Sequence, residues 1–212
     1  AIDRANRVGT PVWVDASLTV NGDFEPLRLL KRRREQSLLR ATDRVLVTAP
    51  KVIERFRDRH LYDETVASAF SVVGHPVDTD RFHPPRDQSA ASEEDDSVTF
   101  LAVARLVPEK GLMYILEALA PLLAERPALE FRILGAGPMR DHLARRAAEL
   151  GVESAMTFLG TVPHGEVPAV LRTADVFVSH AVANAHWEEF FGVANLEAMA
   201  TGLPTVVSDC GA

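Results

Sequence analysis

The chain has 212 residues, of which 47% are hydrophobic and 25% charged, which is typical of a globular protein with one large domain or two modest ones. Its net charge of −7 is uneven, because residues 1–85 contain 14 Lys and Arg against 12 Asp and Glu, whereas residues 86–212 contain 9 against 18. This acidity argues against nucleic-acid binding through the phosphate backbone, and no apolar run approaches the roughly 18–20 residues of a membrane-spanning helix.

Both ends of the sequence suggest a fragment. The chain opens on AIDRANRVG, which resembles the tail of a helix, and stops at SDCGA, directly after an apolar strand. We therefore expect both ends to be cut. The single cysteine, Cys210, excludes an internal disulfide, which fits a reducing compartment, and we expect a cytoplasmic protein. No His–Asp pattern accompanies Cys210, so we interpret it as an inert thiol.

The first part of the chain alternates short strands with helices. We predict strands over residues 11–15, 44–48 and 70–74, and helices over 25–42 and 50–60. The stretch PPRDQSAASEEDDS, residues 84–97, has two prolines, small polar residues and an acidic run, and this composition predicts a linker or surface loop.

The second part has a cleaner alternation. We predict strands over 98–104, 129–135, 155–160, 174–180 and 204–209, and helices over 109–126, 139–150, 166–172 and 192–200. Short apolar strands between amphipathic helices predict βαβ units, and therefore an α/β fold with a doubly wound, Rossmann-like parallel sheet. Ligands of such sheets bind beyond the carboxyl ends of the strands, so the loops of interest follow Ala104, Gly135, Gly160, Ser179 and Asp209.

The loop after the first of these strands reads ARLVPEKG. Arg105 ends the strand and Lys110 begins the helix, where Pro108 and Glu109 are favoured first-turn residues. An Arg fork and a Lys point charge beside helix N–H groups can hold a diphosphate. The alternative is a surface Arg and Lys near a helix cap.

A second feature lies in EEFFGVANLEAMATGLPTV, residues 188–206. Glu189 precedes and Glu197 lies within a helix that we expect to begin at Gly192, where backbone N–H groups can approach a ligand closely. The two carboxylates can accept hydrogen bonds from two hydroxyl clusters of one ligand. The alternative is an acidic segment that merely stabilises the helix, but Glu197 has apolar neighbours, among which a carboxylate requires a partner.

Other site classes find little support. Gly135-Ala136-Gly137 begins like a dinucleotide fingerprint, but Arg140 occupies its third glycine position, so a nicotinamide site is not predicted. His180 and His186 are six residues apart and no carboxylate-rich His cluster exists, so no metal site is predicted. The Gly-x-Ser-x-Gly elbow of serine hydrolases is not in the sequence.

These motifs together resemble a known family. VARLVPEKG, LGAGP, VTFLGTVP and EEFFGVANLEAMATGLPTVVSDCGA closely resemble the donor domain of the family 4 glycosyltransferases, which have the GT-B fold of two Rossmann-like domains. ATDRVLVTAPKVIERF resembles the last unit of that family's acceptor domain. The resemblance implies an acceptor-domain remnant over residues 1–83, a linker over 84–97, and a donor domain, incomplete at its carboxyl end, over 98–212.

The family pattern implies a function and roles for particular residues. A retaining, metal-independent glycosyltransferase without cofactor is expected, which takes its sugar from a UDP- or GDP-linked donor. Arg105 and Lys110 would hold the diphosphate, Glu189 would contact the sugar, and Glu197 would accept hydrogen bonds from the ribose. The resemblance also assigns further donor contacts to Gly135, Phe191, Gly192 and Val193, and places Val162 near the base.

Some features limit this reading. The sequence has Asp15 at the end of its first predicted strand, PVWVD, in the region where the family often has a His. A GT-B sugar-nucleotide epimerase and a non-catalytic sugar-nucleotide-binding module remain as alternatives. Release of nucleoside diphosphate only in the presence of acceptor would exclude the epimerase, and donor binding without turnover would favour the binding module.

The segment RLLKRRREQSLLR, residues 28–40, is basic and contains four leucines. Many relatives act on lipid-linked or glycan acceptors, and such a helix can rest on anionic headgroups at the inner face of a membrane. The alternative is a packed helix with a solvated basic face. If the segment contacts membranes, the intact protein will co-sediment with anionic liposomes but not with neutral ones; no co-sedimentation would end the idea.

Overall fold

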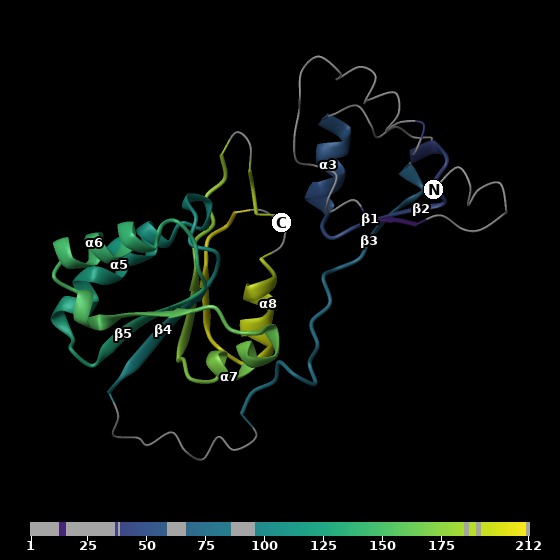
Figure 1. Ribbon diagram of the computed structural model, residues 1–212. Helices are drawn as coiled ribbons and strands as arrows, with labels where there is room; N and C mark the ends of the chain where they lie inside the picture. The colour runs from purple at the N-terminus through teal and green to yellow at the C-terminus, as the bar shows by residue number, and fades with distance from the viewer. Residues whose placement is uncertain are drawn as a thin grey trace. The chain divides into compact units, whose positions relative to one another are not determined.

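The computed structural model describes residues 13–15, 37, 39–58, 67–85, 96–184, 187–189 and 192–210. The chain forms two compact units (Figure 1). The first comprises residues 1–75, 185–191 and 211–212, and the second comprises residues 76–184 and 192–210. The assignment of an acceptor domain, a linker and a donor domain to 1–83, 84–97 and 98–212 stays a prediction.

The first unit contains a parallel sheet in the order β1-β2-β3. Its elements are β1 (Trp13–Asp15), β2 (Arg44–Val47), β3 (Phe70–Val72) and the helix α3 (Pro50–Asp58). Val45 and Val47 alternate with more exposed residues along β2 and pack against Val52 and Phe56 of α3. The predicted strands and the helix at 50–60 are confirmed to within a few residues, whereas most of the predicted helix 25–42 and most of the basic segment 28–40 lie outside the described residues.

The second unit has a five-stranded sheet in the order β6-β5-β4-β7-β8, and every neighbouring pair is parallel. Its strands are β4 (Val98–Val103), β5 (Leu129–Leu134), β6 (Met156–Gly160), β7 (Val176–Ser179) and β8 (Thr205–Val207). The chain runs outward from β4 through β5 to β6 and then returns to the other side of β4. The direction of winding therefore reverses between β4 and β7, and ligands of such sheets bind at the carboxyl ends of the strands at that point.

Helices cover both faces of this sheet (Figure 1). The helices α5 (Leu112–Glu125) and α6 (Arg140–Glu149) pack on one face, and α7 (Val167–Leu171) and α8 (Val193–Ala200) pack on the other. Three 3-10 helices, η3 (Pro108–Lys110), η4 (Glu153–Ala155) and η5 (His164–Glu166), precede α5, β6 and α7. The predicted α/β class with Rossmann-like parallel sheets is confirmed.

The helix predicted over 109–126 is divided in two. Gly111 adopts a left-handed conformation with φ 59° between η3 and α5. It ends η3 by donating its N–H to the Pro108 carbonyl and accepts at its own carbonyl the first bonds of α5. Helical spacing of the leucines placed this segment correctly but could not reveal the break, because a glycine is compatible with either conformation.

The segment before the acidic stretch is attached to the second unit. Phe82 is only 2% exposed and packs in the core beneath α7 and α8. Arg172 donates through Nη2 to the carbonyl of Arg81 at 2.7 Å and through Nε to that of His83 at 3.2 Å. These contacts fix residues 81–83 on the second unit and bring Phe82 close to the loop after β6.

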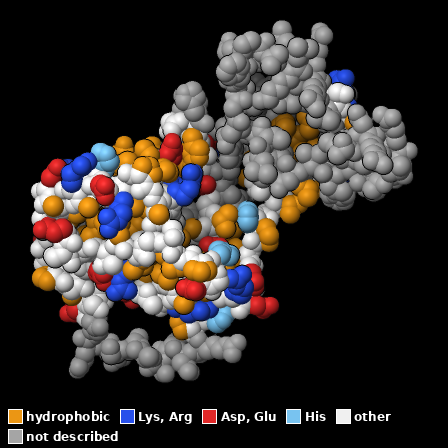
Figure 2. All heavy atoms as spheres, in the orientation of Figure 1, with side chains coloured by type: hydrophobic (Ala, Val, Ile, Leu, Met, Phe, Trp, Pro, Cys, Tyr) orange, Lys and Arg blue, Asp and Glu red, His pale blue; other side chains and the backbone are white. Residues whose placement is uncertain are grey.

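The described surface has no dominant sign of charge in the view of Figure 2, where acidic, basic and apolar side chains are interspersed over the second unit. Within the described part of the chain, no helix is both long and apolar enough to span a bilayer.

Candidate functional site

The loops that follow β4, β5 and β6 form one continuous edge at the carboxyl ends of the strands. The N–H of Ala104 donates to the Leu134 carbonyl at 3.0 Å, and that of Leu106 donates to Ala136 at 2.9 Å. The N–H of Gly135 in turn donates to the carbonyl of Gly160 at 2.6 Å. This backbone network fixes the three loops relative to one another, as a preorganised binding edge requires.

Glycines allow this close approach. A Cβ on Gly111 would lie 1.8 Å from the carbonyl oxygen of His180, and one on Gly135 would lie 1.8 Å from that of Ala104. Gly111 and Gly135 have φ values of 59° and 146°, in the region that favours glycine. The glycines after β5, which begin like a dinucleotide fingerprint, therefore pack the loop against the chain after β4.

The two predicted phosphate-binding cations lie at the ends of the loop that follows β4. Leu106 is completely buried and anchors the loop in the core, whereas Arg105 is exposed beside it. Lys110 is half-buried at the end of η3. The N–H of Val182 donates to the carbonyl of Glu109 at 2.9 Å, so this loop also meets the chain after β7. Both cations thus lie at the point where the winding of the sheet reverses.

Helix α8 begins as predicted. Its N-cap, Gly192, has φ 53°, and the N–H of Asn195 donates to the Gly192 carbonyl at 2.8 Å. This left-handed conformation favours glycine, and a Cβ at this position would also require the Asn195 side chain to move. Val193, the first helical residue, is exposed.

Glu197 lies in the second turn of α8 and is only 8% exposed. Its Oε1 lies 2.7 Å from Nε2 of His164, the first residue of η5 in the loop after β6. An ionised carboxylate can only accept hydrogen bonds, so with Glu197 ionised Nε2 of His164 is the donor. The Glu197 carbonyl also accepts from the Thr201 hydroxyl at 2.8 Å. The contact brings a carboxylate and an imidazole together at the carboxyl edge of the sheet.

His164 was not predicted as a site residue, because the seven histidines are scattered along the sequence. Its position in the sequence could have indicated it, because His164 lies in the loop after Gly160, one of the loops in which ligands of such sheets bind. Val162, two residues earlier, is half-buried and packs against the core beneath α7 and α8.

Glu189 and Glu197 belong to different units of the chain, so the predicted pairing of the two carboxylates stays a prediction. Glu189 is half-buried and lies in the segment 185–191, which groups with the first unit, where the neighbouring Glu188 forms an ion pair with Lys51. Phe191 lies outside the described residues. The roles assigned to Glu189 and Phe191 stay predictions.

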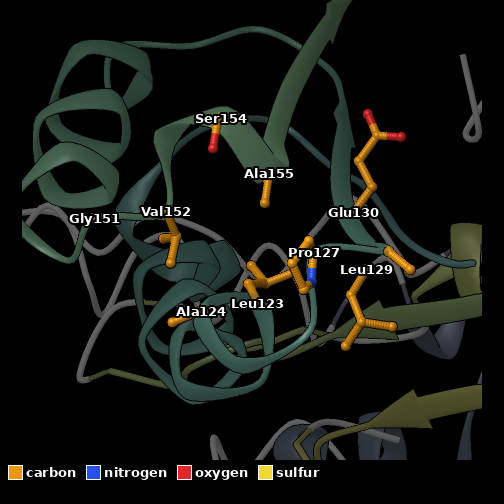
Figure 3. A pocket seen from close by; sticks show the side chains of 10 residues that line it. Leu123, Ala124, Pro127, Leu129, Glu130, Gly151, Val152, Ser154 and Ala155 are labelled. Carbon is orange, nitrogen blue, oxygen red and sulfur yellow. The ribbon is translucent and has the colours of Figure 1, made fainter.

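A pocket of about 440 Å³ lies at the opposite edge of the sheet, between the end of α5, the start of β5 and the turn after α6 (Figure 3). Glu130 is its charged lining residue, and Arg132 donates to that carboxylate at 2.9 Å and Thr157 at 2.7 Å. The hydrogen bond from Arg132 holds the pKa of Glu130 below its usual value. With no Lys, Arg or His in its lining, this pocket does not suit a diphosphate.

The chain belongs to the family described as "Glycosyl transferases group 1", whose sequence profile matches residues 85–212, more than half of the chain. It is 36% identical over 141 residues to the GDP-mannose-dependent alpha-(1-6)-phosphatidylinositol monomannoside mannosyltransferase of Mycolicibacterium smegmatis, covering 64% of this chain and 37% of that protein. It is 34% identical over 151 residues to the lipopolysaccharide core biosynthesis mannosyltransferase LpsB of Rhizobium meliloti, covering 67% and 41%. The chain thus spans less than half the length of these relatives.

Solved structures agree on the fold. Anabaena Alr3699/HepE in complex with UDP is similar with a TM-score of 0.71 and 17% identity, over 99% of this chain and 56% of that chain. The apo lipopolysaccharide outer core galactosyltransferase WaaB is similar with a TM-score of 0.64 and 21% identity, over 100% and 53%. The resemblance to GT-B glycosyltransferases is confirmed.

The packing at Gly111 predicts an unusually costly alanine substitution. Gly111→Ala introduces a left-handed alanine and also a clash with the His180 carbonyl. Gly151→Ala is the matched control, because Gly151 has φ 71° but nothing within 4 Å of a Cβ. We expect the control to lose about 1–2 kcal/mol of unfolding free energy from backbone strain alone, and Gly111→Ala clearly more. Equal losses in denaturant titrations would contradict the packing described for this edge.

Proposed function

We propose that the chain forms the donor-binding part of a retaining glycosyltransferase, which moves a sugar from a nucleoside diphosphate sugar to an acceptor hydroxyl. The observation on which this rests is the buried carboxylate of Glu197 at the carboxyl edge of the sheet, with His164 as its side-chain partner among the described residues. A carboxylate so placed has further lone pairs available for donors, and the two hydroxyls of a ribose are donors of the right kind. Membership of the glycosyltransferase family supports this assignment.

The diphosphate is proposed to bind where the winding of the sheet reverses. Arg105 precedes η3 and Lys110 ends it at that point, in the part of the chain, residues 86–212, that contains 18 acidic against 9 basic residues. The guanidinium presents a fork of donors to phosphate oxygens and the ammonium presents a point charge. Two such cations neutralise the charge that develops on the departing nucleotide, so we propose transfer without a metal ion.

The proposed reaction is a displacement with retention. The bond from the anomeric carbon to the β-phosphate oxygen breaks, and the acceptor hydroxyl attacks the same face of the oxocarbenium-like centre. The hydroxyl proton passes to the departing phosphate oxygen. Arg105 and Lys110 stabilise the leaving diphosphate, while Glu189 and the N–H groups at Phe191, Gly192 and Val193 are proposed to hold the sugar and phosphate.

The names of the relatives and structural neighbours indicate which donors and acceptors to test. The mycobacterial relative is named as GDP-mannose-dependent and acts on a phosphatidylinositol monomannoside, and the Anabaena structure contains UDP. We therefore propose a GDP- or UDP-linked hexose as donor and a glycan or lipid-linked sugar as acceptor. The epimerase and the non-catalytic binding module remain the competing functions, and turnover in the presence and absence of acceptor separates them.

Saturation-transfer NMR on the intact protein tests the donor site. With UDP, GDP, ADP and NADH offered separately, we expect signal from a uridine or guanosine diphosphate. In Glu197→Ala the signal should weaken most at the ribose protons. Signal from NADH alone, or from none of the four, would overturn the proposed function.

Substitution of the cations tests the phosphate assignment. Arg105→Ala and Lys110→Ala should each lower kcat by about 10²–10³, the usual effect of removing one group that stabilises developing negative charge. Arg126→Ala is the control, because Arg126 is an exposed arginine that follows α5 at the other edge of the sheet. Loss of activity in the control, or full activity in both site variants, would contradict the assignment.

A further inference from the structure

We propose that His164 is a positioning residue for the nucleotide, which holds the Glu197 carboxylate in the orientation that receives the ribose hydroxyls. The inference rests on the proposed function of Glu197 and adds a residue to that site. It starts from the 2.7 Å contact between Nε2 of His164 and Oε1 of Glu197.

The contact occupies only part of the carboxylate. Two carboxylate oxygens offer about four lone-pair positions, and His164 uses one of them on Oε1. A ribose can therefore donate to Oε2 and to the free side of Oε1 without displacing the imidazole. Among the described residues no fully buried side-chain nitrogen or oxygen lacks a hydrogen bond.

His164 is itself restrained from the other side. Its ring centroid lies 5.5 Å from that of Phe82, at an interplanar angle of 46°. Phe82 is 2% exposed, and Arg172 fixes the backbone on both sides of it. The histidine thus lies between a buried aromatic ring and a buried carboxylate, although its side chain is 62% exposed. An exposed imidazole held in this way is suited to transmit a fixed geometry to Glu197.

A positioning role predicts a specific defect. Without the imidazole, the Glu197 carboxylate can rotate toward other donors or water. Binding of a ribose must then return the carboxylate to the required orientation. Nucleotides that lack ribose hydroxyls should not sense the change. The ribose preference of the protein should therefore fall, whereas its affinity for the rest of the nucleotide should not.

The test is calorimetric titration of the intact protein with whichever of UDP and GDP the wild type binds, and with its 2′,3′-dideoxy analogue. We expect the wild type to prefer the ribonucleotide by about ten- to a hundredfold, which is the range for hydrogen bonds to a charged group. His164→Ala should lower that preference at least about fivefold through weaker binding of the ribonucleotide, with the Kd of the dideoxy analogue unchanged.

Two variants serve as controls. His164→Gln places an amide nitrogen at the same distance along the side chain as Nε2 and should restore the preference. His142→Ala removes an exposed histidine of α6 and should leave the preference unchanged. In kinetics, His164→Ala should raise the donor KM and leave kcat nearly constant.

The outcomes separate this inference from the proposed function. If the wild type binds no nucleoside diphosphate, the proposed function fails. If the wild type binds with a ribose preference that His164→Ala leaves intact, the positioning role fails and the proposed function stands. The same holds if the ribonucleotide binds more tightly to His164→Ala, a result that would mean that the imidazole competes with the ribose. An equal loss for both nucleotides would also overturn the positioning role, because that result is expected from a purely structural residue.

Discussion

Glu197 on α8 is only 8% exposed, and a charged carboxylate buried to this degree requires hydrogen-bond donors. The fold supplies His164 from the loop after β6. For this contact to form, α8 must pack against the face of the sheet that α7 covers, and η5 must begin directly after Pro163. The position of the carboxylate therefore depends on the packing of one whole face of the second unit.

The edge on which Glu197 lies is built by close backbone approach. Five parallel strands end at the same side of the sheet, and the loops after β4, β5 and β6 are joined by main-chain hydrogen bonds. Gly111 and Gly135 leave no room for a Cβ between neighbouring loops. A binding edge of this kind presents N–H groups and a few cations in fixed positions, which is how an acidic protein can bind a diphosphate.

The order of elements was predictable because short apolar runs between turn residues indicate buried strands, as in VTFLAV and LEFRIL. That Glu197 has a hydrogen-bond partner was predictable, because a carboxylate among apolar neighbours on a helix needs one. The identity of that partner was not, since His164 and Glu197 are 33 residues apart and meet only through tertiary packing. The docking of Phe82 was missed for the same reason, and so was the close approach of the His180 carbonyl to Gly111 at the break. Local patterns indicate which face is buried, but not which distant side chain completes a site.

The most direct test of the account is a crystal structure of the intact protein with the nucleoside diphosphate that it binds. The account predicts ribose hydroxyls within hydrogen-bond distance of the Glu197 carboxylate, His164 still in contact with Oε1, and the diphosphate between Arg105 and Lys110. A nucleotide bound elsewhere, such as in the pocket at the amino end of β5, or a ribose directed away from Glu197, would contradict it.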